Sequence, residues 1–277
     1  MKALLQNLIP QHLLSRLSGQ IAESRHPWLK NKLISYFMKH YHINMHEAIR
    51  ENPQDYLSFN DFFIRQLKPN LRPICPGENA IASPVDGCIA QIGQAKSNQL
   101  LQAKDFYFDL ENLLGKDVAL AKKFYDANFA TLYLAPSNYH RVHMPLTGTL
   151  VKSIYVPGKL FSVNRMTSEL VPHLYSRNER LITVFETETG PMAIILVGAL
   201  IVGSMQTVWM EHAIRANEIL QQTHTGPHLL KGSELGHFKL GSTVILLFPK
   251  DSTQWDSALK ANTCIQLGQY LGNTCKN

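Results

Sequence analysis

The sequence predicts an α+β protein in which a mainly antiparallel, barrel- or sandwich-like β core follows an N-terminal helical region. Two observations lead to this prediction. Apolar residues recur at three- and four-residue spacing near the N-terminus, whereas short β-rich runs alternate with Pro and Gly from about Leu71 onward. We therefore divide the chain into a helical region, residues 1–65, and a core, residues 66–277.

The helical region contains two amphipathic stretches. The second begins near Pro27 and carries Trp28 close to its polar border, while the first forms an apolar stripe of Leu4, Leu5, Leu8, Ile9, Leu13, Leu14, Leu17 and Ile21. Seven Lys and Arg residues face only two Glu residues over positions 1–50. This pattern is typical of a helix lying on an anionic membrane, and it suits a bundle packed on the core equally well.

The core is predicted from runs of β-forming residues, with few helical intervals such as 109–125. The runs are 80–84, 88–92, 129–134, 148–151, 181–185, 193–197 and 243–248. The apolar stretch from Pro191 to Met205 contains Gly198 and Gly203 and is shorter than the roughly 20 residues of a membrane-spanning helix. We expect buried strands there and no transmembrane span.

Composition narrows the class of protein. With 277 residues, 45% hydrophobic and 17% charged, the chain is long enough for a sizeable core. The net charge of +6 suits an anionic membrane, and no nucleic-acid-binding motif accompanies it, so nucleic acid is not an expected partner. The four cysteines are scattered without metal-ligand spacing, which favours a reduced, cytoplasmic setting and no metal site.

Near the C-terminus, Leu240-Gly241-Ser242-Thr243 opens an apolar run. Because Gly241 lacks a Cβ, its carbonyl carbon tolerates a strained approach, and Ser242 supplies an oxygen that could attack it. Such an attack would cut the chain and could leave a pyruvoyl group on the new N-terminus. The same residues also suit an ordinary turn or strand entry.

A second motif places His140 and His143 before Pro145. If Ser137 caps a single helical turn that carries His140, and Pro145 keeps the following residues extended, the two imidazoles could face one pocket. A metal pair would need a third ligand, and two ordinary polar histidines are the simpler interpretation.

A third motif, Ser83-Pro84-Val85-Asp86-Gly87, joins two apolar runs. Asp-Gly is typical of a hairpin turn, and a structural aspartate is the default interpretation. Asp86 could instead orient a histidine, as the acid of a triad does. A serine hydrolase would also need Ser, His and Asp, but Gly-x-Ser-x-Gly is absent around Ser242.

Taken together, these motifs and others make the chain resemble bacterial phosphatidylserine decarboxylase proenzymes of the membrane-associated type. The resemblance covers nearly the whole chain. It is carried by residues 59–65, 84–87, 102–104, 139–145, 156–158, 161–164, 178–180 and 240–243.

The resemblance implies a self-processing enzyme. Asp86 would orient His143, and His143 would deprotonate Ser242, which attacks the Gly241 carbonyl. The resulting ester would eliminate and hydrolyse to a pyruvoyl group and ammonia, leaving a β chain, residues 1–241, and an α chain, residues 242–277. The pyruvoyl group derived from Ser242 would be the covalent cofactor, with no metal.

It also implies the reaction and its setting. Phosphatidylserine would form a Schiff base with the pyruvoyl group and lose CO2, and His140 would protonate the carbanion to give phosphatidylethanolamine. Phe161, Ser162 and Asn164 would line the substrate pocket. The processed α/β protomers are expected to form a homodimer bound peripherally to anionic lipid on the cytoplasmic face of the cell (inner) membrane.

Three other functions fit the sequence less well. A catalytically silent membrane-surface protein would need damage to one of the motifs, and Asp86, His143, Gly241 and Ser242 are all present. A pyruvoyl decarboxylase of a soluble amino acid has no use for a basic amphipathic N-terminus. A serine hydrolase would be labelled at Ser242 by a fluorophosphonate.

Overall fold

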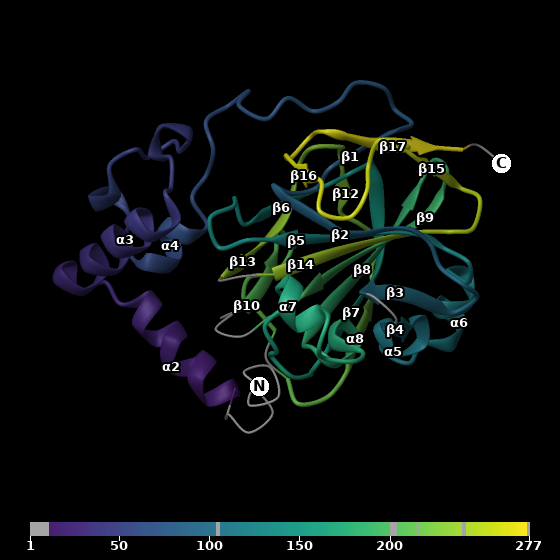
Figure 1. Cartoon of the computed structure of the whole chain (residues 1–277), viewed down its shortest axis with the longest axis horizontal. Coiled ribbons are helices and arrows are strands. Elements are labelled where there is room, and N and C mark those ends of the chain that lie inside the picture. Colours follow the sequence, from purple (N-terminus) through teal and green to yellow (C-terminus); the bar gives the residue numbers. More distant parts are fainter. Residues whose placement is uncertain (1–10, 104–105, 200–203, 215, 240–241, 276–277) are drawn as a thin grey trace.

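The structure is a computed structural model that describes residues 11–103, 106–199, 204–214, 216–239 and 242–275. Helices near the N-terminus lie to one side of a β-rich core that contains the rest of the described chain (Figure 1).

The N-terminal helices enclose a small aromatic core of their own. Ile34, Tyr56 and Phe62 are fully buried in it, and Ser58 caps the last of these helices by accepting a hydrogen bond from Asp61 N. The elements are α2 (Gln11–Glu23), α3 (Pro27–Tyr41), the 3-10 helices η1 (Met45–Glu47) and η2 (Pro53–Asp55), and α4 (Phe59–Phe63).

The outer surface of these helices remains apolar in part. Trp28 is 65% exposed, and Leu14, Leu17, Ile21 and Tyr36 are also exposed. Among the helices that the structure describes, none is long and apolar enough to cross a membrane. Residues 1–10 of the predicted apolar stripe lie outside the described part of the chain.

The main sheet has nine antiparallel strands. Its order has two ends, so the described strands form an open sheet rather than a closed barrel. In spatial order they are β11 (Leu220–Thr223), β7 (Gly148–Val156), β8 (Arg180–Thr187), β9 (Gly190–Val197), β14 (Ser242–Phe248), β5 (Asn128–Leu134), β2 (Gly87–Gln94) and β16 (Cys264–Ile265), with β12 (His228–Leu229) also paired to β7.

Three small antiparallel sheets complete the β structure. The first contains β1 (Ala80–Ala82), β17 (Tyr270–Thr274) and β15 (Thr253–Trp255); the second contains β10 (Ser204–Thr207), β13 (Glu234–Lys239) and β6 (Arg141–His143); the third pairs β3 (Gln99–Ala103) with β4 (Phe106–Asp109).

Four short helices lie against the core. They are α5 (Leu110–Leu113), α6 (Val118–Lys123), α7 (Arg165–Ser168) and α8 (Leu174–Arg177). The single helical interval predicted over 109–125 is therefore wrong in detail. Gly115 and Lys116 adopt left-handed backbone angles, with φ of +74° and +66°, and a helix cannot continue through such residues.

Side chains on the two faces of the main sheet fill two separate cores. Along β14, Ile245 and Leu247 pack with residues of α5, α6 and α8, whereas Val244 and Leu246 pack toward β6 and β13. This alternation is what a strand buried on both faces requires. The α+β class with a sandwich-like antiparallel core is confirmed, and the division at residue 65 stays a prediction.

Candidate active site

Ser242 is the first residue of β14, a strand held on both sides. Its backbone is opposite Leu134 of β5, and the next residue, Thr243, is opposite both Tyr133 of β5 and Val197 of β9. The predicted cleavage partner, Gly241, lies outside the described residues. The sequence folds this way because residues 243–248 are a continuous apolar run, which suits a strand buried between neighbours.

The chain that leaves β5 turns back beside β13 and delivers His140. Asn138 makes the turn, since its Oδ1 accepts from Ala135 N at 2.7 Å while its own N–H donates to Ala135 O at 2.9 Å. His140 O then accepts from Phe238 N at 3.0 Å. The helical turn predicted after Ser137 is wrong, because Asn138 stabilises a non-helical turn in its place.

His140 is completely buried and neutral. Its Nδ1 lies 2.8 Å from Asn138 O, so Nδ1 carries the proton and Nε2 keeps a lone pair. Nε2 has no hydrogen-bond partner among the described residues, and the Phe63 ring lies against the imidazole at a centroid distance of 4.0 Å. Burial lowers the pKa of His140 to about 3.

His143 lies in β6, extended as Pro145 predicts, and both of its ring nitrogens are engaged. Nδ1 donates to Gly232 O at 2.8 Å, and Nε2 accepts from the Tyr139 hydroxyl at 3.1 Å. Burial lowers the pKa of His143 as well, against the carboxylate of Glu234, which raises it. The imidazole is therefore neutral with its lone pair on Nε2.

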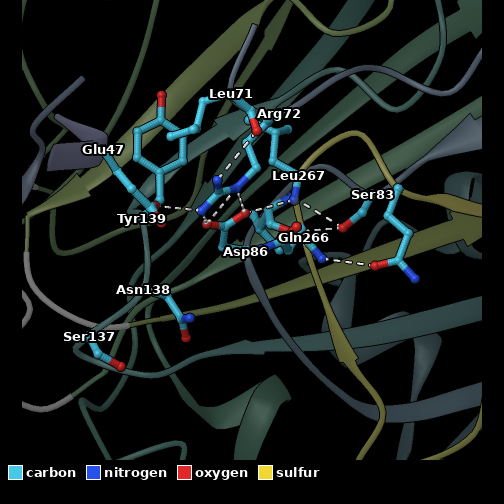
Figure 2. A network of polar contacts seen from close by, with 12 residues as sticks. Glu47, Leu71, Arg72, Ser83, Asp86, Ser137, Asn138, Tyr139, Gln266 and Leu267 are labelled. Atoms are coloured by element: carbon cyan, nitrogen blue, oxygen red, sulfur yellow. Dashed lines mark hydrogen bonds and ion pairs between the residues drawn. The ribbon is translucent and has the colours of Figure 1, made fainter. Parts of the chain in front are cut away.

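Asp86 is paired with Arg72 rather than with either histidine. Arg72 donates from Nε at 3.1 Å and from Nη2 at 2.8 Å to the carboxylate, and Leu267 N donates to Oδ1 at 2.8 Å (Figure 2). Arg72 also donates to Glu47 at 2.8 Å, so it joins the N-terminal helices to the Asp86 turn. The two carboxylates raise the pKa of Arg72 above its ordinary value.

The Asp86 and His143 motifs are nevertheless in contact through the backbone. His143 N donates to Pro84 O at 2.9 Å, two residues before Asp86. The direct Asp86–His143 hydrogen bond expected of a triad is not formed, since each side chain has other partners. The hairpin expected at Asp86-Gly87 is also absent among the described strands, because β1 pairs with β17 while β2 pairs with β5 and β16.

The pairing with β13 shows where His140 and His143 lie relative to each other. His143 is opposite Glu234, whereas His140 accepts its backbone hydrogen bond from Phe238, closer to Ser242 in the chain. The separation from Glu234 to Phe238 is four residues, about 13 Å along an extended strand. The two histidines therefore contact β13 at different levels, His143 near its start and His140 near its end.

Two arginines, one buried and one partly buried, connect the histidine segment to the end of α4. Arg65, which is 5% exposed, donates to Ser137 O at 3.2 Å, and Arg141 donates from Nε to Ile64 O at 2.8 Å. Arg141 also makes a paired contact with both carboxylate oxygens of Glu234, at 2.7 and 2.8 Å. The end of α4 is thereby fixed against the turn that carries His140.

The predicted pocket residues fall beside a cavity rather than on its wall. Phe161 is fully buried in the core, and Asn164 caps α7 by accepting from Thr167 N while it donates to Ser162 Oγ. Between them, Val163 does line a cavity next to β2 and β5, together with Tyr133, Tyr175, Gln102, Arg165 and Ser168. No group of three potential metal ligands occurs within the described residues.

The sequence matches a known family. A family model described as phosphatidylserine decarboxylase matches residues 59–273, which include Asp86, His140, His143 and Ser242. The chain belongs to the phosphatidylserine decarboxylase family. A second model, described as PSD, matches residues 1–42.

Relatives within the phosphatidylserine decarboxylase family resemble the chain over almost its full length. A phosphatidylserine decarboxylase proenzyme from Azotobacter vinelandii is 49% identical over 273 residues, which is 96% of each chain. The proenzyme from Saccharophagus degradans is 46% identical over 271 residues, covering 96% of this chain and 95% of the relative.

Three residues of this phosphatidylserine decarboxylase family member gain a place in the site that the sequence did not give them. Arg65 and Tyr139 lie in motifs that contribute only to the family resemblance. A charged or phenolic group among apolar residues was the signal that could have identified them as site residues. Arg72 lies in the irregular segment before β1, where no periodicity points to a partner.

Proposed function

We propose that the chain is a self-processing phosphatidylserine decarboxylase proenzyme, cleaved between Gly241 and Ser242. Family membership and the relatives' names support decarboxylation of phosphatidylserine and the existence of a precursor. The observation that carries the proposal is the junction at Ser242. Ser242 begins a strand that pairs with β5, and the same chain holds two histidines, His140 and His143, whose pKa values are lowered by burial.

His143 would act as the general base for cleavage. Its Nε2 lone pair is free of a proton, because Nδ1–H is fixed by Gly232 O. A shift of the Tyr139 hydroxyl would let Nε2 accept the Ser242 proton as the Ser242 oxygen attacks the Gly241 carbonyl carbon. The amide then becomes an ester, and the Gly241–Ser242 C–N bond breaks.

Asp86 acts in this scheme through position and charge. The Asp86 turn supports the His143 backbone through Pro84 O, and the carboxylate contributes a negative field that raises the pKa of His143. That field favours the imidazolium that forms during attack. Arg72 and Leu267 N hold the carboxylate in place.

Within the described residues, the site has an unpaired polar atom that is compatible with a pyruvoyl group. Nε2 of buried His140 is a polar atom with no partner among the described residues, so it is available to a polar group that enters the site. The pyruvoyl ketone would bind the serine amine of the lipid and accept the electrons left when CO2 departs.

His140 would hold and deliver a proton at Nε2. In the free protein its pKa of about 3 keeps it neutral, which differs from an ordinary histidine that is already half protonated near neutral pH. An anionic phospholipid head group in the site would raise that pKa, because a nearby negative charge stabilises the imidazolium.

Peripheral membrane binding is part of the proposal. The exposed Leu14, Leu17, Ile21 and Trp28 of α2 and α3 could enter the head-group region while basic side chains meet anionic lipid. The cytoplasmic face of the inner membrane and a homodimer of processed protomers complete this proposal.

The test is release of CO2 from phosphatidylserine in detergent micelles. Wild-type protein should release it, free serine should be a poor substrate, and Ser242→Ala should be inactive and remain one chain. Uncleaved wild-type protein with full activity would overturn the proposal. Turnover of free serine at the same rate would reject phosphatidylserine as the intended substrate.

A further inference from the structure

Two cysteines outside the candidate site lie directly opposite each other at the edge of the main sheet. Cys88 of β2 is the register partner of Cys264 of β16. Their Sγ atoms are 3.0 Å apart, and both residues are free thiols. Cys88 is half-buried and Cys264 is exposed, so a small oxidant in solvent can reach the pair.

The backbone geometry at this position suits a disulfide. Residues directly opposite each other on antiparallel strands have Cβ atoms about 4.5–5.5 Å apart, and a disulfide joins Cβ atoms roughly 3.5–4.5 Å apart. The sulfur atoms need to approach by only about 1 Å to reach the length of an S–S bond. Neighbouring contacts hold the strands together, since Ile89 N donates to Thr263 O at 2.9 Å.

We propose that Cys88 and Cys264 form a reversible disulfide when the protein meets a thiol oxidant. The two residues lie on opposite sides of Gly241–Ser242. In a processed enzyme the bond would therefore join the α chain to the β chain covalently. This consequence rests on the proposed cleavage, whereas the bond itself does not.

The reaction balances with a small-molecule disulfide as oxidant. The thiolate of exposed Cys264 attacks one sulfur of the oxidant, forms a mixed disulfide and expels one thiolate. The Cys88 thiolate then attacks the Cys264 sulfur and expels the second thiolate. The protein loses two protons and two electrons, and the oxidant is reduced to two thiols.

Cys264 should meet the oxidant first, because it is exposed whereas Cys88 is half-buried. Burial, followed by the neighbouring Cys264, raises the pKa of Cys88 to about 11, so little of its thiolate exists near neutral pH.

The location gives the bond a structural effect near the site. Cys88 lines the same cavity as Tyr133, and Tyr133 is opposite both Cys88 and Thr243 in the sheet. A bond at Cys88 would brace the edge of the sheet two strands away from β14.

The experiment treats purified full-length protein with oxidised glutathione, removes the oxidant, alkylates the remaining thiols and maps digested peptides. We expect a Cys88–Cys264 peptide and loss of two of the four thiols. On a denaturing gel the small fragment should stay attached without reductant and separate after dithiothreitol. Cys264→Ser should abolish the bond, and Cys75→Ser is the matched control that should retain it.

The uncleaved variant Ser242→Ala separates this proposal from the proposed function. Its digest should contain the same cross-linked peptide although it never yields two fragments. If reduced wild-type protein stays one chain, the proposed cleavage fails while the peptide map still decides the disulfide. A map with only glutathione adducts, or with bonds that involve Cys75 or Cys275 in its place, would overturn the inference.

Discussion

The turn that carries His140 and the strand that carries His143 provide opposite environments for two histidines only three residues apart. His140 is enclosed by Phe63 and backbone, with one ring nitrogen lacking a partner among the described residues. His143 has both nitrogens engaged and lies near Glu234. This difference suggests separate roles for the two histidines. His143, with its polar neighbours, would act as the base for cleavage, whereas the buried, neutral His140 would interact with the charged substrate.

The largest effect should come from removing the cleavage base. His143→Ala should slow appearance of the small fragment by about 10²–10⁴-fold, the range for general-base catalysis. Denaturing gels over time measure this rate. His212→Ala, an exposed histidine, is the matched control and should process normally. Normal processing of His143→Ala would reverse the assignment of tasks.

His140→Ala should separate the two reactions. Cleavage should proceed, whereas turnover of phosphatidylserine by the cleaved protein should fall at least about 100-fold, since proton transfer by a positioned group is lost. The measurement is CO2 release per mole of small fragment. A cleaved variant with wild-type turnover would remove His140 from the reaction.

Removing the Arg72–Asp86 ion pair should destabilise the turn that contacts the His143 backbone. Arg72 and Asp86 side chains are 11% and 9% exposed, so Arg72→Met leaves a largely buried carboxylate without its charge partner. We expect a loss of about 3 kcal/mol in the free energy of unfolding, and slower processing. Urea unfolding measures the former. Lys68→Met, which breaks an exposed ion pair with Glu51, should cost less than about 1 kcal/mol.

Acid should destabilise the protein through the buried imidazole. The pKa of His140 is lowered, so the unfolded chain binds more protons between its ordinary value of 6.5 and about 3. Stability is complete above pH 6.5 and falls as pH decreases, by about 1 kcal/mol per pH unit from this group. The free energy of unfolding, measured with urea between pH 6.5 and 5, should fall more steeply for wild type than for His140→Gln, by about 1 kcal/mol per pH unit. An equal pH dependence in the two proteins would contradict the burial of a neutral His140.

The smallest effect should follow Tyr139→Phe. The Tyr139 hydroxyl is hydrogen-bonded to Nε2 of His143, the atom that would accept the Ser242 proton in the proposed cleavage. Removing one hydrogen bond, worth about 1 kcal/mol, should raise the rate of processing by no more than about fivefold. A rate that falls tenfold or more would give the hydroxyl a direct part in the reaction.

The sequence predicted the elements that carry strong periodicity or long apolar runs. Residues 243–248 and 129–134 become adjacent strands because continuous β-branched and aliphatic residues fit a sheet covered on both faces. The break between α5 and α6 was missed, although Gly115 was a visible signal for a helix end.

The polar connections of the site were harder to predict because they join distant segments. Nothing local to Arg72 reveals that Asp86 and Glu47 will meet it, and the expected Asp86–His143 pair gave way to that stronger charge contact. The burial of His140 also depends on Phe63 from another region. The lowered pKa of His140 could therefore not be predicted from the residues next to it in the sequence.

The central claim is that Ser242 becomes a pyruvoyl group, and the intact mass of the small fragment tests it most directly. Reduced, denatured wild-type protein should yield a fragment of residues 242–277 that is lighter by one ammonia than the peptide beginning with serine. Its N-terminus should also resist sequential degradation. A fragment with the full serine mass, or no fragment from an active preparation, would contradict the account.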